Sequence, residues 1–282
     1  MNDKTAMPGR FTGKVVLVTG GSRNTGLEIV DLFLREGARV FFCGTSEESS
    51  GSGARELARR GLGGFTALTC DVGRTDDVTA MMDAIASEAG RLDVVVTNAA
   101  HLGQGEGPAD KTREEDFFAV LNVNLGGTLR VVQQAVNRFF LRQELNPATG
   151  QRGVVVCIGS NTAQHVQRCH VSYCTSKGGL ESMVKCFAVD LGSKGIRVNL
   201  LEPGYIWTER WNKLPDYVQK KRRANTLTGR ESTGRNVADA VAFLASDASA
   251  TVQGAILKMD SGATVALYPA YCEDSIRLEE VK

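Results

Sequence analysis

The chain has 282 residues, of which 42% are hydrophobic, so it can bury a full core as one large α/β domain or two small ones. Its 33 lysine and arginine residues nearly balance its 32 aspartate and glutamate residues, which excludes a general attraction to nucleic acid or anionic membranes. No apolar run approaches the roughly 20 residues of a membrane span, and residues 1–10 lack the apolar core of a signal peptide.

Short apolar runs alternate with helical patterns along almost the whole chain. Residues 15–18 form an apolar run, and in residues 27–34 the apolar positions recur every three to four residues, which predicts a helix that ends at Gly37. Further strands are predicted at residues 40–43, 65–70, 92–96, 154–158, 198–201 and 255–259. Helices are predicted between them, for example at residues 75–89, with Thr75 as N-cap, and at 237–245.

Seven apolar strands separated by helices predict a parallel sheet that is covered on both faces, in a doubly wound α/β fold. We expect a single domain over residues 1–282, with its core at about 13–262 and a C-terminal tail at 263–282, because no linker or internal repeat divides the chain. Residues 146–153 are predicted to be an exposed loop. Residues 208–233 form a long connection between a strand and a helix, which predicts a lid over a functional site.

The cysteines and histidines give no sign of a metal site. The seven cysteines lack C-x-x-C spacing, and several lie in apolar runs, such as Cys157 within residues 154–158. This is typical of reduced core cysteines and predicts a protein of the reducing cytoplasm. The three histidines have no nearby acidic partners, so we expect no bound metal.

The stretch TGGSRNTG, residues 19–26, lies between the first predicted strand and the first predicted helix. Its glycines, Gly20, Gly21 and Gly26, would let a phosphate approach free backbone N–H groups at the positive end of the helix. Asn24 stands where such loops usually carry glycine, and asparagine is one of the few other residues that tolerate a positive φ. Glycine also occurs in such turns for packing alone, so the loop by itself leaves both interpretations open.

A second group of residues suggests acid–base chemistry. On a helix, Tyr173 and Lys177 would share one face, with the ammonium near the phenol oxygen. A tyrosine pKa is ordinarily about 10, and a neighbouring cation can lower it by roughly 1–3 pH units. Ser160 follows the predicted strand at residues 154–158, where its hydroxyl could bind a substrate carbonyl. Taken singly, the Tyr–Lys spacing also arises by chance, and a serine after a strand is often only a turn residue.

In this order and spacing, the motifs resemble the classical branch of the short-chain dehydrogenase/reductase family from about residue 13 to residue 262. TGGSRNTG is similar to the family's T-G-x-x-x-G-x-G, TNAA at 97–100 to N-N-A-G, and PGYIWT at 203–208 to P-G-x-I-x-T. The departures are Asn24, Thr97 and Ala100. The resemblance implies a Rossmann-like fold and the catalytic residues Asn124, Ser160, Tyr173 and Lys177. It implies that the cofactor is bound by Gly20, Ser22, Arg23, Asn24, Thr25, Gly26, Thr45, Ser46, Asp71, Val72, Asn98, Ala99, Ala100, Tyr173, Lys177, Pro203, Gly204, Ile206 and Thr208.

The reaction implied by the resemblance moves a hydride between NAD(P)(H) and a carbonyl. Ser160 and Tyr173 would polarise the carbonyl oxygen, and Tyr173 would exchange the proton. Lys177 would lower the pKa of Tyr173 and hold the nicotinamide ribose, and Asn124 would position a water molecule. We therefore expect an oxidoreductase that interconverts a ketone and a secondary alcohol on a small organic substrate.

The end of the second predicted strand favours NADP(H) over NAD(H). Proteins that prefer NAD carry an acid there, on the ribose 2′-hydroxyl. This strand ends in CGTS, residues 43–46, and the first acid is Glu47. Arg23, with Thr45 and Ser46, could instead bind a 2′-phosphate. In the opposite interpretation Arg23 is solvated and Glu47 reaches back to the ribose.

The substrate and the assembly are less closely defined. In the lid, Trp207, Trp211, Leu214 and Tyr217 could cover a ring or an acyl chain. The basic run KKRR at 220–223 fits a solvated helix face, or a surface that attracts an acidic substrate or carrier protein. The tail is longer than is usual in the family and is expected at a subunit interface of a homodimer or homotetramer.

Three narrower or different functions stay open. The chain could be a β-ketoacyl-carrier-protein reductase, or a regulatory homologue that binds the cofactor with little turnover. An enoyl reductase of the same fold is the third, and the Y-x-x-x-K spacing disfavours it.

Overall fold

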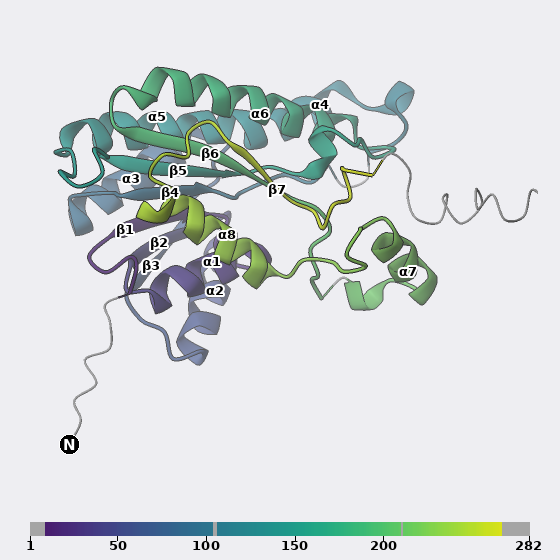
Figure 1. The fold of residues 1–282 in the computed structure, drawn as a ribbon, viewed down its shortest axis with the longest axis horizontal. Coiled ribbons are helices and arrows are strands. Elements are labelled where there is room, and N and C mark those ends of the chain that lie inside the picture. The colour runs from purple at the N-terminus through teal and green to yellow at the C-terminus, as the bar shows by residue number, and fades with distance from the viewer. Residues whose placement is uncertain (1–8, 104–105, 210, 267–282) are drawn as a thin grey trace, which may run out of the picture.

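The computed structural model describes residues 9–103, 106–209 and 211–266, in which seven parallel strands form one sheet (Figure 1). The strands lie in the order β3-β2-β1-β4-β5-β6-β7, so the order reverses between β1 and β4, as in a doubly wound fold. The expected Rossmann-like architecture is confirmed. The strands are β1 Val15–Thr19, β2 Arg39–Gly44, β3 Phe65–Thr69, β4 Val94–Thr97, β5 Gly153–Ile158, β6 Ile196–Pro203 and β7 Ile256–Met259.

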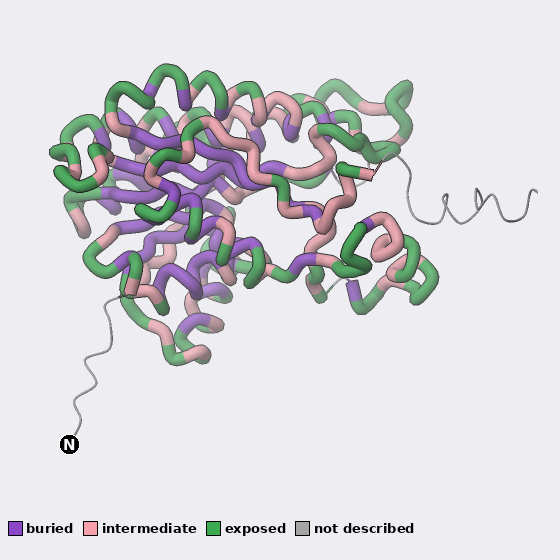
Figure 2. Tube along the Cα trace, in the orientation of Figure 1, coloured by how far each residue is buried: buried purple, intermediate pink, exposed green. Residues whose placement is uncertain are grey.

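Alternate side chains of the strands enter two separate cores, because successive residues of a strand point to opposite faces. In β1, Val15 and Leu17 pack on one face, and Val16 and Val18 pack on the other. Helices α3 (Thr75–Ala89), α5 (Thr128–Arg138) and α6 (Val171–Gly192) cover the first face, and α4 (Glu114–Leu121) packs beside α6. Helices α1 (Asn24–Arg35), α2 (Glu47–Arg59) and α8 (Gly234–Ala245) cover the second face. Figure 2 shows the buried strands, in purple, between these two layers.

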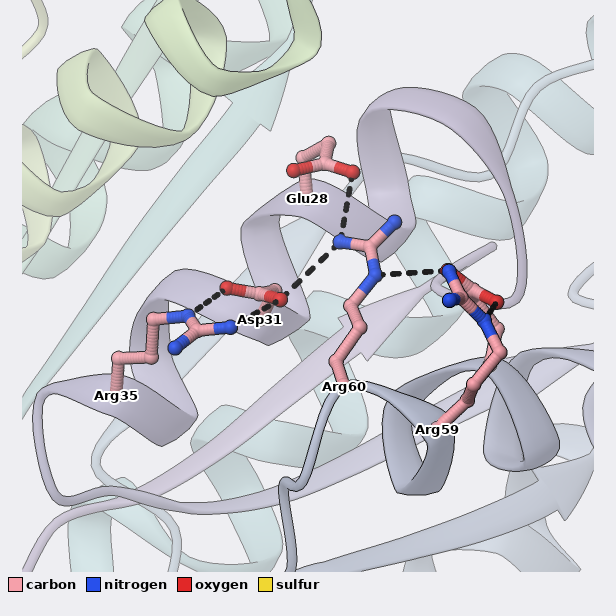
Figure 3. A network of polar contacts seen from close by, with 6 residues as sticks. Glu28, Asp31, Arg35, Arg59 and Arg60 are labelled. Carbon is pink, nitrogen blue, oxygen red and sulfur yellow. Dashed lines mark hydrogen bonds and ion pairs between the residues drawn. The ribbon is translucent and has the colours of Figure 1, made fainter.

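Helices α1 and α2 are joined by a network of ion pairs around Arg60 (Figure 3). Arg60 donates from Nη1 to Glu28 (2.8 Å) and Asp31 (3.1 Å), and from Nε to Glu56 (2.9 Å). Burial acts to raise the pKa of Asp31, but the hydrogen bonds from Arg35 and Arg60 outweigh it and hold that pKa below its usual range. The network fixes the helix whose N-terminus begins at the glycine-rich loop.

Most boundaries differ from the sequence prediction by one to three residues, and three of the differences have a visible cause or consequence. Helix α1 begins at Asn24 rather than at residue 27. The N-cap of α3 is Arg74, and Thr75 is the first helical residue, because a turn from Asp71 to Arg74 (N···O 2.9 Å) closes before it. Strand β6 starts at Ile196, earlier than predicted, and so includes the charged residue Arg197. The buried Arg197 side chain can lie within the sheet because it donates to the carbonyls of Leu244 (2.8 Å) and Ser246 (3.1 Å).

The segment at 208–233 is not an irregular loop. It contains a short 3₁₀ turn, Trp211–Lys213, and helix α7, Asp216–Ala224, which lies beyond the strand ends, apart from the helix layers (Figure 1). A bridge joins Ile206 to Ser232 at its base, where Trp207 N donates to Ser232 O (2.7 Å). The segment therefore leaves and returns to the sheet at one point.

Some expectations fall at the chain ends. The first eight residues and most of the tail, with Tyr268, Tyr271 and Cys272, lie outside the described residues. Cys43, Cys70, Cys157 and Cys174 are buried as expected, whereas Cys169 and Cys186 are exposed. No helix in the described ranges is both long enough and apolar enough to cross a membrane. The exposed loop ends at Arg152, because Gly153 is already a buried residue of β5.

Candidate active site

The glycine-rich loop turns sharply between β1 and α1. Gly20 has a φ of +63°, and Asn24 has a φ of +48°, so the expectation that asparagine tolerates the left-handed region is confirmed. A Cβ on Gly26 would lie 2.1 Å from the carbonyl oxygen of Gly20, so only glycine allows α1 to begin this close to the loop. The loop keeps the path that brings backbone N–H groups and a helix N-terminus to one point, which fits a pyrophosphate.

Asn98 ties this loop to the end of β4. Its Nδ2 donates to the carbonyls of Thr19 (3.0 Å) and Gly20 (2.9 Å). In return, the Thr19 hydroxyl accepts from the backbone N–H groups of Asn98 and Ala99, both at 3.1 Å. Both side-chain N–H groups of Asn98 are therefore committed to the loop backbone, and the residue holds the loop in position.

The ends of β2 and β3 lie at the same edge of the sheet. Arg23 and Thr45 are exposed there, and no side-chain hydrogen bond of either is found among the described residues. Ser46 is the N-cap of α2, accepting from Ser49 N at 3.2 Å, and Ser22 pairs with the Ser49 hydroxyl at 2.8 Å. The two serine hydroxyls thus already have protein partners, while Arg23 and Thr45 are accessible to a ligand.

The turn after β3 carries Asp71, whose carboxylate accepts from the backbone N–H of Gly73 at 2.9 Å. The next residue, Val72, is 4% exposed and packs into the core rather than presenting its side chain to solvent. A Cβ on Gly127 would lie 2.6 Å from Val72 Cγ2, so this turn is packed tightly against the start of α5.

Tyr173 and Lys177 lie in the first two turns of α6, opposite the end of β5. The Lys177 ammonium donates to the carbonyl of Ile158 (2.8 Å) and lies 5.5 Å from the centre of the Tyr173 ring. Ser160 follows β5 by two residues, and its hydroxyl accepts from the Thr162 backbone N–H (3.2 Å) and hydroxyl (2.9 Å). The three residues predicted from the spacing are brought to one edge of the sheet.

The pKa of Tyr173 corrects the sequence prediction. Burial raises it above its ordinary value, and the Ser160 hydroxyl acts in the opposite direction. The net direction is therefore opposite to the one predicted, and the Lys177 ammonium donates to the carbonyl of Ile158. Burial lowers the pKa of Lys177 itself to about 8.

Asn124 lies in a π-helical segment, Asn122–Gly127, between α4 and α5. It is 2% exposed, and its Nδ2 donates to His101 O (3.0 Å) and Ser176 Oγ (2.8 Å), while His101 N donates to its Oδ1 (2.7 Å). Ser176 in turn donates to the Tyr173 carbonyl (2.7 Å). Asn124 is thereby linked to the turn of α6 that carries Tyr173. Wider helical turns of this kind often occur at functional sites.

Glu202 is a buried acid close enough to the site to act on the pKa of Lys177, and the sequence analysis did not single it out. It is 0% exposed, next to the last residue of β6, and neither carboxylate oxygen has a hydrogen-bond partner in the described part of the chain. Burial raises its pKa to about 7, and the nearby Glu181 adds to this effect, while Glu202 acts to raise the pKa of Lys177. The sequence offers one signal for a buried carboxyl here, because Glu202 stands within the run of strand residues that ends at Pro203.

The segment after β6 carries the remaining predicted residues. Gly204 must be glycine, since a Cβ there would lie 2.7 Å from the Cβ of Asp260. Pro203 ends the strand, Ile206 forms the bridge to Ser232, and the Thr208 carbonyl accepts from Trp211 N (2.8 Å). These positions connect the sheet edge directly to the segment at 208–233.

A cavity of about 910 Å³ lies over this edge and is lined by Ser160, Tyr173 and Gly204 together with residues of the segment at 208–233. Trp211 lines it, as expected, but Trp207, Leu214 and Tyr217 do not, and Tyr217 is 65% exposed. A different cavity, of about 490 Å³, lies at the amino ends of β4 and β5, and Tyr173 is not among its lining residues.

Comparisons with known proteins agree with this arrangement. A family model described as "Enoyl-(Acyl carrier protein) reductase" matches residues 20–264. L-fucose dehydrogenase from Bos taurus is 35% identical over 250 residues, covering 86% of this chain and 87% of that protein. D-threitol dehydrogenase from Mycolicibacterium smegmatis is 35% identical over 263 residues, covering 91% and 95%. The chain belongs to the short-chain dehydrogenase/reductase family.

Two further comparisons fit this membership. The 3-oxoacyl-acyl-carrier-protein reductase FabG of Thermotoga maritima is 32% identical over 257 residues, covering 91% of this chain and all of that protein. The crystal structure of gox2181 superposes with a TM-score of 0.81 at 30% identity, covering 90% of this chain and 97% of that one. The chain is an NAD(P)(H)-dependent oxidoreductase that interconverts a ketone and a secondary alcohol.

Proposed function

We propose that this oxidoreductase acts on a small carbonyl or alcohol substrate bound in the 910 Å³ cavity, with Tyr173 as the group that exchanges the proton. The observation that carries the proposal is that residues from the end of β5 and from α6 meet at one cavity. Ser160 and Tyr173 line its wall, and Lys177 lies directly behind that wall. We also propose that the protein is cytoplasmic and that it forms homotetramers or homodimers. Light scattering would measure the oligomeric state.

The nicotinamide, when bound, supplies or accepts the hydride. The hydroxyls of Ser160 and Tyr173 bind the substrate oxygen, since both line the cavity. Burial keeps Tyr173 protonated near neutral pH, so in the reducing direction its hydroxyl donates a proton to the oxygen as negative charge develops there. Lys177 uses one N–H on Ile158 and has two more to direct at ribose hydroxyls.

The proton that Tyr173 gives up has to be replaced. Asn124 supports this step because both of its N–H groups have protein partners, while Oδ1 accepts one bond from His101 N and keeps capacity for a water molecule. A water held there is the route by which we propose that the site exchanges protons with solvent.

The remaining predicted residues are proposed to hold the dinucleotide. The loop from Gly20 to Gly26 would bind the pyrophosphate, with Asn98 holding the loop in place, and Asp71 and the backbone of Val72 would contact the adenine. Arg23 and Thr45, both exposed, bind a 2′-phosphate, so NADP(H) is the preferred cofactor. Ser46 contributes less than expected, because its hydroxyl caps α2. Pro203, Gly204, Ile206 and Thr208 line the nicotinamide end.

A second candidate is reduction of a 3-oxoacyl thioester, because reductases of that kind are among the relatives. The test is a screen of ketones, sugars and acyl thioesters with NADPH and NADH, followed by the absorbance of the reduced nicotinamide. Turnover of a ketone or its alcohol that is lost in Tyr173→Phe supports the proposal. Turnover that Tyr173→Phe retains would refute the role of Tyr173, and activity on acyl thioesters alone would select the second candidate.

A further inference from the structure

The cavity over Tyr173 has an unbalanced set of charges. Its described lining contains no aspartate or glutamate, and its one residue with a permanent charge is Arg222, from α7 of the lid. His165 and His170 line it as well. A cavity lined in this way attracts an anion and disfavours a cation.

Arg222 is held in the cavity wall by two aromatic rings. Its guanidinium carbon lies 5.5 Å from the centre of the Tyr205 ring and 5.4 Å from that of Trp211. The two rings lie edge to face, with centres 6.2 Å apart, and Trp211 is only 3% exposed. Contact with ring faces fixes a guanidinium but leaves its N–H groups, which point outward in its own plane, able to bind a ligand.

The neighbouring basic residues of α7 are placed differently. Arg223 forms two hydrogen bonds of 2.8 Å with the Glu231 carboxylate, and Lys221 is exposed. For Arg222, no ion pair or side-chain hydrogen bond is found within residues 9–103, 106–209 and 211–266. Of the run KKRR at 220–223, Arg222 alone lines the cavity, so this run is more than a solvated helix face.

We infer that the substrate carries an anionic oxygen group, a carboxylate or a phosphate, and that Arg222 binds this group while the carbonyl or alcohol lies at Ser160 and Tyr173. The inference rests on the proposed function for the reacting end of the substrate. A guanidinium presents parallel N–H groups that match two oxygens of either anion, which fixes orientation as well as affinity. The lid would then close over the substrate with its own charged contact, so binding of the anion and closure would be coupled.

Matched substrate pairs test this inference. Levulinate is compared with its methyl ester, and dihydroxyacetone phosphate with dihydroxyacetone, so that each pair differs in the anionic group. We expect the wild type to favour at least one anion over its neutral partner in kcat/KM. Arg222→Ala should lower kcat/KM for that anion by about 10- to 100-fold, the worth of a charge-assisted hydrogen bond, mainly through KM. The neutral partner should change less than about twofold, and Arg222→Lys should retain part of the preference.

Lys221→Ala is the matched control, because it removes the same charge from an exposed position one residue away. Equal loss for anion and neutral partner in Arg222→Ala would overturn the inference, as would a wild type without preference for either anion. Calorimetric titration of levulinate and dihydroxyacetone phosphate into the NADP⁺ complex measures binding of the anion without turnover, so it tests the anion site separately from the proposed reaction. Binding of an anion that Arg222→Ala abolishes would uphold the anion site even where the full screen finds no carbonyl or alcohol turnover, a result that would refute the proposed reaction alone.

Discussion

The buried carboxyl of Glu202 makes the stability of the protein depend on pH in a defined direction. Its pKa is raised from 4.5 to about 7 in the folded protein, first by burial and then by Glu181. A carboxyl whose folded pKa lies above its unfolded value contributes stability that is complete below about pH 4.5 and is lost as the pH rises through about 7. The difference of about 2.5 pH units corresponds to about 3 kcal/mol.

The perturbation is Glu202→Gln, which keeps the shape of the side chain and cannot ionise. At pH 4 to 5 the variant and the wild type should unfold with similar free energies. At pH 8 the variant should be more stable, by up to about 3 kcal/mol, because the wild type then keeps a charged group without a hydrogen-bond partner inside the sheet. Urea denaturation at a series of pH values, followed by circular dichroism, measures the difference.

Glu181→Gln is the matched control, since it removes a neighbouring negative charge and leaves Glu202 in place. It should reduce the pH dependence without abolishing it, because burial is the larger cause of the raised pKa. If the stabilities of wild type and Glu202→Gln run parallel from pH 5 to pH 8, the pKa of Glu202 is not raised in the folded protein and the reasoning fails.

Three other predictions concern the proposed reaction and its cofactor. Tyr173→Phe should lower kcat by roughly 10²- to 10⁴-fold with little change in cofactor Kd, measured by nicotinamide absorbance and fluorescence titration; an unchanged kcat would contradict it. Residues 208–233 should be the most protease-sensitive internal segment, and cofactor with substrate should protect them; equal cleavage with and without ligands would identify a plain surface segment. Arg23→Ala should weaken NADPH about 10- to 100-fold and spare NADH, whereas Thr45→Asp should favour NADH; tighter NADH binding by the wild type would refute this assignment.

The structure changes the design of that last variant. From the sequence, Gly44 is the natural place for an acid on the ribose. A Cβ at Gly44, however, would lie 3.0 Å from the backbone nitrogen of Ser50 and 2.9 Å from the Ser49 hydroxyl. Thr45 is exposed and next in the chain, so a carboxylate there tests cofactor choice without disturbing α2.

The fold could be predicted because its signals are local. Most strands are short apolar runs, such as the buried Val94–Thr97, and the helices between them carry apolar residues at helical spacing. The positive φ of Asn24 was likewise predictable, since it depends on residue type and on its place between a strand and a helix. The N-cap of α3 was not, because the turn from Asp71 to Arg74 decides it.

The features that the sequence could not predict depend on distant contacts. Glu202 on β6 acts on the pKa of Lys177 on α6, and Ser176 bonds to Asn124 from another helix. Spacing placed the Lys177 ammonium near the phenol oxygen, whereas the carbonyl of Ile158 draws it away. The basic run at 220–223 gave no means of separating Arg222 from its neighbours, because that depends on where Tyr205 and Trp211 lie.

Isotope transfer tests the central claim most directly. The protein is incubated with a ketone accepted in the screen and with NADPH or NADH that carries deuterium on one face of the nicotinamide C4, and the alcohol is examined by mass spectrometry and NMR. The account predicts one deuterium on the carbinol carbon, from one face of the nicotinamide only, with the transfer slowed in Tyr173→Phe. The account is contradicted if the alcohol contains no deuterium whichever face of the nicotinamide is labelled. It is also contradicted if the deuterium lies on a carbon other than the former carbonyl carbon.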